Sequence, residues 1–153
     1  MSNLNLESLN LPGHFIRHAA FLGELTRRVG PVNDFAFTLI SRGSGRVAIR
    51  SVNFRDRFLR HRAFRIHLEG PAGPDDDIWM QDSTFFFEQG LADRAGVSFR
   101  SVNFPDRYLR HRDFHLVLDP PSGPGDELFR RDATFFRRPA AVLIDEGTEL
   151  NPV

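Results

Sequence analysis

The sequence predicts an all-β fold assembled from three copies of one unit, and three observations lead to this prediction. A segment of about 40 residues occurs twice with the same spacing, a weaker copy precedes it, and no stretch has the apolar period of a long helix. A chain of 153 residues can bury roughly two-thirds of its surface as one domain. We therefore expect a single domain over residues 1–153, with repeats at about 3–46, 47–96 and 97–145.

The repeat is clearest in the second and third copies. Residues 47–65 read VAIRSVNFRDRFLRHRAFR, and residues 97–115 read VSFRSVNFPDRYLRHRDFH. Aligned without a gap, residues 47–87 and 97–137 are identical at 22 of 41 positions. The first copy is weaker, and its residues 4–21 align with residues 97–114. It retains Ser8, Asn10, Pro12, Arg17, His18 and Phe21, and the NDFAF of residues 33–37 stands where the later copies have D-x-T-F-F.

Within a copy the pattern predicts four short strands. Val97–Ser101 alternates apolar and polar residues, as a half-buried strand does. Turn-forming residues follow, with Pro105 placed to fix a turn. Two further strands are predicted at 108–112 and 114–118, and a Pro- and Gly-rich loop follows. Leu128–Phe129 and the segment 133–136 are expected to form the fourth strand region.

The arrangement of the copies predicts the architecture. Three copies of four strands give about twelve strands, and closing them around a threefold axis protects the sheet edges. Three units are too few for a solenoid with its own caps. The 16 Phe residues suit a core of equivalent aromatic side chains. The expected core comprises Phe54, Phe64, Phe85, Phe104, Phe114 and Phe135. These constraints favour a β-trefoil with pseudo-threefold symmetry over a β-sandwich, which would not explain three copies.

Composition excludes several classes of function. Twenty Arg and no Lys balance 20 acidic residues, so a general polyanion binder is disfavoured and no nucleic-acid partner is expected. The absence of Cys excludes a disulfide scaffold and a thiolate zinc site. No phosphate- or dinucleotide-binding fingerprint occurs, and we expect neither a metal nor a cofactor. The acidic runs at 75–77 and 126–127 are interpreted as exposed loop polarity.

The sequence also bears on membrane association and compartment. No window approaches the roughly 18 apolar residues that span a bilayer, and the N-terminus lacks the features of a signal peptide. We expect a monomer with no membrane partner. The compartment stays open, because the chain as written would remain in the cytoplasm whereas a module of a longer secreted protein would not.

A His and an Asp recur at the same place in each copy and are the candidate binding residues. An ionised Asp accepts hydrogen bonds from two neighbouring hydroxyls, and a neutral His donates at one ring nitrogen and accepts at the other. The pairs are His18 with Asp34, His61 with Asp82, and His111 with Asp132. Two alternatives remain open: the His closes a strand end, or the Asp organises a turn. The Arg residues beside each His are interpreted as a solvated strand face with Arg–Asp pairs.

The motif [FY]-L-R-H-R-x-F followed by D-x-T-F-F resembles the AbfB domain, the arabinofuranose-binding module of α-L-arabinofuranosidase B (carbohydrate-binding module family 42). The likeness covers about residues 3–145 and is strongest in 101–136. It implies a β-trefoil with one pocket per repeat, in which the His and the Asp hold the hydroxyls of a terminal arabinofuranose. The sequence departs from the family after the His, where Ala19, Arg62 and Arg112 replace a Tyr. Arg62, Arg112, Tyr108 and Phe58 are expected at the pocket edge.

The function predicted from the sequence is non-catalytic, lectin-like binding of arabinose-containing polysaccharides or oligosaccharides, such as the side chains of arabinan and arabinoxylan. A glycosidase needs two carboxylates flanking one bond, whereas each copy here offers one motif Asp. The alternative is an intracellular trefoil scaffold for protein–protein interaction, which the missing signal peptide and the residues that replace Tyr favour.

Overall fold

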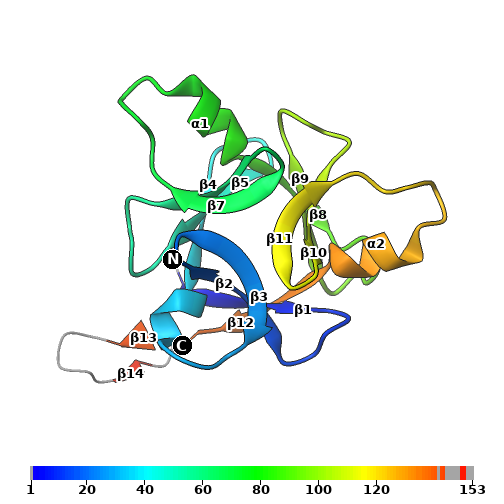
Figure 1. Ribbon diagram of the computed structural model, residues 1–153, viewed down its shortest axis with the longest axis horizontal. Coiled ribbons are helices and arrows are strands. Elements are labelled where there is room, and N and C mark those ends of the chain that lie inside the picture. Colours follow the sequence, from blue (N-terminus) through cyan, green and yellow to red (C-terminus); the bar gives the residue numbers. More distant parts are fainter. Residues whose placement is uncertain (1, 141, 144–148, 151–153) are drawn as a thin grey trace.

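The computed structural model describes residues 2–140, 142–143 and 149–150, and its strands follow one another in three sets of four (Figure 1). The first set is β1 (Leu4–Ser8), β2 (His14–Ala19), β3 (Leu22–Arg27) and β4 (Phe37–Ser41); the second is β5 (Arg46–Ser51), β6 (Phe58–Arg62), β7 (Arg65–Glu69) and β8 (Phe85–Gln89); the third is β9 (Val97–Ser101), β10 (Tyr108–Arg112), β11 (His115–Asp119) and β12 (Phe135–Pro139). A short helical segment precedes the last strand of each set: η1 (Val32–Phe35), α1 (Asp77–Asp82) and α2 (Glu127–Asp132). The predicted all-β class is confirmed.

Beyond the third set, β13 (Val142–Leu143) pairs with β14 (Glu149–Leu150) in a separate two-stranded sheet. The predicted end of the third repeat, at residue 145, lies outside the described residues.

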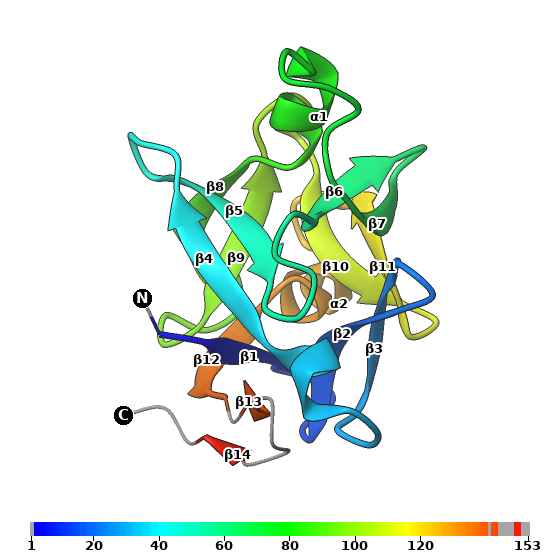
Figure 2. The same ribbon diagram turned by 90° about the vertical axis from the view of Figure 1, so that its left-hand side faces the viewer.

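Six strands close into a ring of antiparallel pairs. The outer strands of the sets pair in the order β1–β12–β9–β8–β5–β4, and β4 returns to β1. The longest registers join neighbouring sets: β1 with β12, β4 with β5, and β8 with β9. Figure 2 shows β4, β5, β8 and β9 side by side in this ring. Because β1 pairs with β12, the first and last sets protect each other's edges.

The middle strands of each set form a hairpin, and the three hairpins contact one another. β3 pairs with β7, β7 with β11, and β11 with β3. Each hairpin turns through two residues with positive φ, and these are Ala20–Phe21, Ala63–Phe64 and Asp113–Phe114. Two consecutive positive φ angles give the turn geometry that matches the right-handed twist of the flanking strands.

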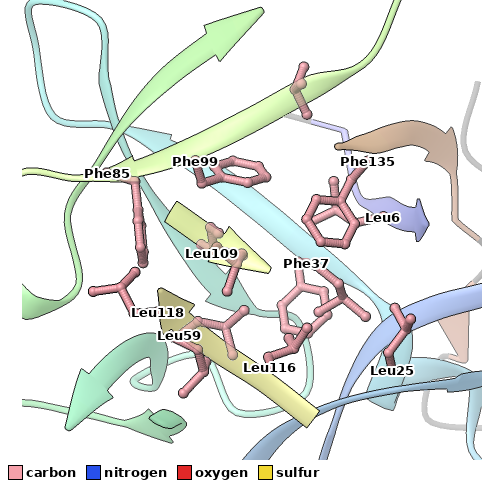
Figure 3. Packing of buried hydrophobic residues seen from close by; sticks show 14 of the residues in the cluster. Leu6, Leu25, Phe37, Leu59, Phe85, Phe99, Leu109, Leu116, Leu118 and Phe135 are labelled. Atoms are coloured by element: carbon pink, nitrogen blue, oxygen red, sulfur yellow. The ribbon is translucent and has the colours of Figure 1, made fainter. Parts of the chain in front are cut away.

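The core lies where the ring and the hairpins meet (Figure 3). Phe37, Phe85 and Phe135 begin β4, β8 and β12, and all three are fully buried. Other core positions also occur in threes, one from each set: Leu6, Ile49 and Phe99; Ile16, Leu59 and Leu109; Leu25, Leu68 and Leu118. The recurrence follows from the repeat, since equivalent residues of three copies pack around a common centre.

The predicted aromatic core is only partly correct. Phe85 and Phe135 are buried as predicted, but Phe54, Phe104 and Phe114 keep 37%, 39% and 54% of their surface exposed. Phe64 is only partly buried. These four side chains lie in the bends after β5 and β9 or in hairpin turns, outside the closed ring of strands.

The segment Leu128–Phe129, predicted as strand, lies in α2. Its cap is Asp126, which accepts a hydrogen bond from the backbone N–H of Phe129; Asp76 caps α1 in the same way through Trp79. The backbone N–H groups of Ala72 and Trp79 lower the pKa of Asp76. Two of the acidic residues interpreted as loop polarity are therefore helix caps. A six-residue helix is too short to show an apolar stripe in the sequence.

The three hairpins meet at a position where the copies differ. Gly23, Ile66 and Leu116 are equivalent residues, each two positions after the turn Phe. A Cβ atom on Gly23 would lie 2.9 Å from Ile66 Cγ2 and 3.1 Å from Leu116 Cδ1. The two larger side chains therefore fill the space that a third side chain would need.

We expect Gly23→Ala to lower the free energy of unfolding by about 1–3 kcal/mol, because it overpacks this contact. Chemical denaturation measures the change. In an Ile66→Ala background the same Gly23→Ala change should cost less than in the unmodified chain, as expected for coupled neighbours. Gly73→Ala is the control, since no atom lies within 4 Å of its added Cβ. Equal effects of Gly23→Ala and Gly73→Ala would contradict the packing argument.

Candidate functional site

The fold brings each predicted His–Asp pair together. His61 is buried on β6 and Asp82 ends α1, and His61 Nε2 lies 3.2 Å from Asp82 Oδ1. The corresponding distances are 3.3 Å for the third pair and 3.7 Å for the first. One local rule places all three carboxylates: each Asp stands three residues before the buried Phe that begins the last strand of its set.

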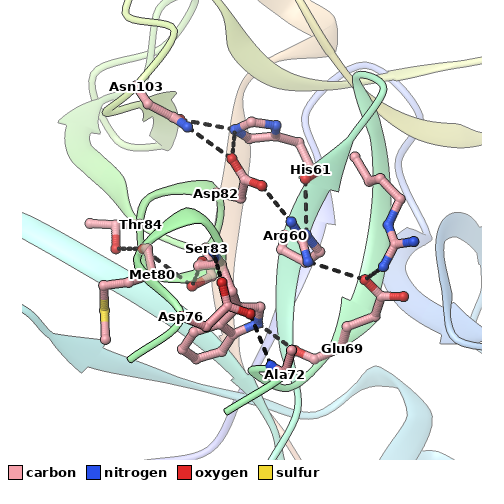
Figure 4. A network of polar contacts seen from close by, with 12 residues as sticks. Arg60, His61, Glu69, Ala72, Asp76, Met80, Asp82, Ser83, Thr84 and Asn103 are labelled. Carbon is pink, nitrogen blue, oxygen red and sulfur yellow. Dashed lines mark hydrogen bonds and ion pairs between the residues drawn. The ribbon is translucent and has the colours of Figure 1, made fainter. Parts of the chain in front are cut away.

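An Asn from the next set completes each cluster. Asn103 donates from Nδ2 to Asp82 Oδ1 at 2.8 Å, and its Oδ1 lies 2.9 Å from His61 Nε2 (Figure 4). Ser101 Oγ also donates to Asn103 Oδ1, at 3.0 Å, and accepts from the Phe104 backbone N–H. Because an amide oxygen only accepts hydrogen bonds, His61 donates from Nε2 to Asn103 Oδ1.

The same contacts recur in the other two clusters. Asn53 lies 2.8 Å from His18 Nε2 and donates to Asp34 at 3.0 Å. Asn10 lies 2.8 Å from His111 Nε2 and donates to Asp132 at 2.6 Å. Because Asn10 belongs to the first set and His111 to the third, the clusters form a closed cycle. Sequence reasoning missed these three Asn residues as site residues, although each occupies an equivalent place in its repeat.

An Arg holds the second oxygen of each Asp. Arg60 Nη2 contacts Asp82 Oδ2, and Arg110 Nη2 contacts Asp132 Oδ2. In the first cluster Arg17 Nη2 lies 3.0 Å from the Asp oxygen. The predicted Arg–Asp pairs are present, but the Arg side chains that make them are only 11–15% exposed and do not form the predicted solvated face. In each cluster the carboxylate is fixed by an Arg and an Asn. This geometry differs from a turn in which the Asp bonds only its own backbone.

An open cavity of about 530 Å³ lies beside the second cluster. His61, Asp82 and Asn103 contribute its polar lining, and Phe64 and Phe104 contribute aromatic surface. The Phe104 ring is edge-on to both His61 and Phe64, with centroids 5.3 Å and 5.2 Å apart. Exposed apolar surface beside a few fixed polar groups is typical of a small-molecule site.

The aromatic surface differs among the clusters. In the first, Phe54 lies edge-on to His18 and to Phe21, with centroids 5.5 Å and 5.3 Å apart. In the third, Leu11 takes the position of Phe104, and Phe114 stacks on His14 at 5.9 Å. The third cluster therefore has one aromatic side chain fewer beside it.

Two of the four residues predicted at the pocket edge lie elsewhere. Arg62 lines the cavity and pairs with Glu69 at 2.5 Å, and Arg112 makes the equivalent pair with Asp119 at 3.1 Å. Phe58, however, packs edge-on against Trp79.

Tyr108 is the second of these residues. It packs against Phe129 and donates to Glu88 Oε1 at 2.8 Å. It stands three residues before the His of its strand, as Phe58 does, which is about 10 Å along an extended chain. Both side chains therefore contact the helix; neither lines the cavity beside the second cluster, and Tyr108 lines a separate cavity of about 220 Å³ with Phe129.

Burial lowers the pKa of His111, so its neutral form is favoured near neutral pH. The described residues contain no group of three or more potential metal ligands. Within the same residues, no helix has the length and apolar character needed to cross a membrane.

Comparisons with known proteins agree with this architecture. The family model of the α-L-arabinofuranosidase B (ABFB) domain matches residues 1–87 and again residues 74–151. An arabinofuranosidase complexed with arabinofuranosyl-α-1,2-xylobiose has a TM-score of 0.79 and 21% identity over 91% of this chain and 31% of that chain. A GH54 α-L-arabinofuranosidase soaked with a cyclic sulfate inhibitor gives 0.78, with the same identity and coverage. A structure described as the BEL β-trefoil gives 0.66, with 20% identity over 90% of this chain and 92% of that chain.

These matches bear on the fold class of the chain and on its family. At such identities the structural likeness shows a shared fold alone, and this chain spans 31% of the length of the two arabinofuranosidase structures. No curated protein sequence matches the chain. The fold class is that of all-β domains built from repeats. The chain belongs to the α-L-arabinofuranosidase B (ABFB) domain family, which confirms the resemblance seen in the sequence.

The environment of Tyr108 gives a spectroscopic prediction. Burial, together with the hydrogen bond to Glu88, raises the pKa of Tyr108 to about 12. Since the chain contains one Tyr, ultraviolet absorbance of the phenolate reports this group alone. We expect a titration midpoint near 12, and a lower one in Glu88→Gln. The folded-state pKa is raised, so the stability from this group is present below pH 10 and is lost as the pH rises from 10 towards 12.

Circular dichroism recorded in parallel verifies that the chain is folded at each pH. A midpoint near 10 in folded protein would show that Tyr108 is not buried against Glu88.

Proposed function

We propose that this chain is a non-catalytic, β-trefoil carbohydrate-binding module that recognises terminal arabinofuranose on arabinan or arabinoxylan side chains. The observation that carries the proposal is the threefold recurrence of one His–Asp–Asn cluster beside exposed apolar side chains, in a chain of the ABFB domain family. An arabinose-containing polysaccharide or oligosaccharide is the proposed partner.

The β-trefoil assignment rests on strand pairing. A ring of six strands is joined to three hairpins that pair with one another, and each set of four strands supplies two ring strands and one hairpin. The likeness to the BEL β-trefoil supports this assignment. We place the repeats at about 3–46, 47–96 and 97–145.

The clusters suit a polyhydroxyl ligand. A carboxylate has about four lone-pair sites, so Asp82 keeps acceptor capacity after bonding Arg60 and Asn103. Because both partners hold the Asp, it meets the ligand in a fixed orientation. A hydrogen bond to a charged group contributes about 1.5–3 kcal/mol before association costs. One small pocket should therefore bind with a millimolar Kd, about −4 kcal/mol, and three pockets gain affinity through avidity on a branched polymer.

The carboxylates are arranged for binding. A glycosidase places two carboxyl groups on either side of a sugar bond, with open space between them. The second carboxylate near Asp82 is Glu69, and Arg60 contacts both of them. The guanidinium group thus bridges these two carboxylates and leaves no open space between them, which supports a module without catalytic activity.

Titration of the protein with arabino-oligosaccharide, followed by calorimetry, tests the proposal. We expect saturable binding with a millimolar Kd per site. Asp132→Asn and His111→Ala should each remove the third site and lower the stoichiometry by one, because each deletes a hydroxyl partner. Arg94→Ala, in the exposed loop between β8 and β9, is the control and should bind as the unmodified chain does.

No saturable binding at millimolar sugar would exclude the proposed function and leave the protein-interaction scaffold as the better hypothesis. Unchanged stoichiometry in folded Asp132→Asn and His111→Ala would exclude the third cluster as a site. A chromogenic arabinofuranoside should not be hydrolysed, and turnover would contradict a non-catalytic module.

A further inference from the structure

An exposed aliphatic side chain recurs on the two helices. Ile78 in α1 keeps 72% of its surface exposed, and Leu128 in α2 keeps 58%. Both stand four residues before the Asp of their cluster. Met80, the other exposed apolar residue of α1, corresponds to Arg130 in α2, so its apolar character is not repeated. Among the exposed positions of the two helices, apolar character therefore recurs at Ile78 and Leu128 alone.

Helix geometry places the Ile78 side chain at the cavity. Residues four apart lie on the same face of an α-helix, so Ile78 and Asp82 project to the same side of α1. Ile78 lines the 530 Å³ cavity together with Asp82, Phe64 and Phe104. The second pocket thus has polar groups from the cluster, aromatic surface from the hairpin and the bend after β9, and an aliphatic side chain from the helix.

We infer that Ile78 and Leu128 are specificity-determining residues, which pack against the C–H groups of a bound sugar in the second and third pockets. The inference rests on the proposed function. A pentofuranose carries hydroxyls that the His–Asp–Asn cluster can bond, and C–H groups that need an apolar partner. Without such a partner, a cluster of hydrogen-bonding groups would accept hydroxyls of many sugars with little discrimination.

The first cluster provides an internal comparison. There the residue four before the Asp is Gly30, whose φ is +90° and where an added Cβ would have no atom within 4 Å. The segment η1 replaces the helix, and the glycine has no side chain to offer. The three pockets should therefore differ in strength, with the first binding more weakly than the second.

Nuclear magnetic resonance can report each pocket separately in the full chain. The side-chain amides of Asn53, Asn103 and Asn10 belong to the first, second and third clusters. The probe is methyl α-L-arabinofuranoside, titrated into the unmodified chain and into Ile78→Ala, Ile78→Leu and Leu128→Ala. Both residues are exposed, so their truncation should leave the fold intact.

We expect Ile78→Ala to weaken binding at Asn103 by about threefold to tenfold, because an apolar contact is lost, and to leave Asn10 unchanged. Leu128→Ala should weaken binding at Asn10 and leave Asn103 unchanged. Ile78→Leu should bind almost as the unmodified chain does. Each Ala variant is thus the control for the other. Xylose is titrated as a second probe. The preference of the second site for the arabinofuranoside over xylose should be smaller in Ile78→Ala than in the unmodified chain.

The outcomes separate the two proposals. If the unmodified chain shifts none of the three Asn signals, the proposed function fails. If it binds the arabinofuranoside and Ile78→Ala binds equally well at Asn103, the function stands and this inference is overturned. Equal weakening at all three signals in Ile78→Ala would also overturn it, since that result reports a change of the whole fold.

Discussion

The hydrogen bonds of one Asn in each cluster are the interaction on which the rest of the structure depends. Asn103 crosses from the third set of strands to a His and an Asp of the second, and Asn53 links the second set to the first. Asn10 closes the cycle by linking the first set to the third. Because each cluster needs two neighbouring sets, the clusters exist only where the sets are docked around the closed ring.

This dependence connects stability and function. In each cluster the carboxylate is neutralised by an Arg, bonded by the Asn and placed against a buried His; Asp82 and Asp132 are buried, and Asp34 is partly buried. Buried charges are tolerated when their partners satisfy them, so the polar groups that we propose to meet a sugar also join the repeats. The same clusters explain why two Phe residues lie outside the core. Phe54 and Phe104 directly follow the bridging Asn, and each packs on the His of the preceding set.

The three copies are equivalent in plan and different in detail. Glycine replaces a large side chain twice in the first set, at Gly23 where the hairpins meet and at Gly30, which takes the place of Ile78 and Leu128. Leu11 replaces the aromatic residue of the other two sets beside the third cluster. The first replacement follows from space at the common centre, where three large side chains do not fit, whereas the other two change what a ligand would contact.

The sequence alone determined the all-β class, the threefold repeat, the family and the six residues of the His–Asp pairs, because each depends on residue types that recur at fixed spacing. Only the tertiary structure decided the remaining contacts. It placed Asn10 beside Asp132, 122 residues away, left Phe54, Phe104 and Phe114 exposed instead of in the core, and turned Leu128–Phe129 into a helix. Local patterns record which face of a segment is apolar, but which repeat supplies a partner is set by closure of the chain around its centre, and no local pattern records that closure.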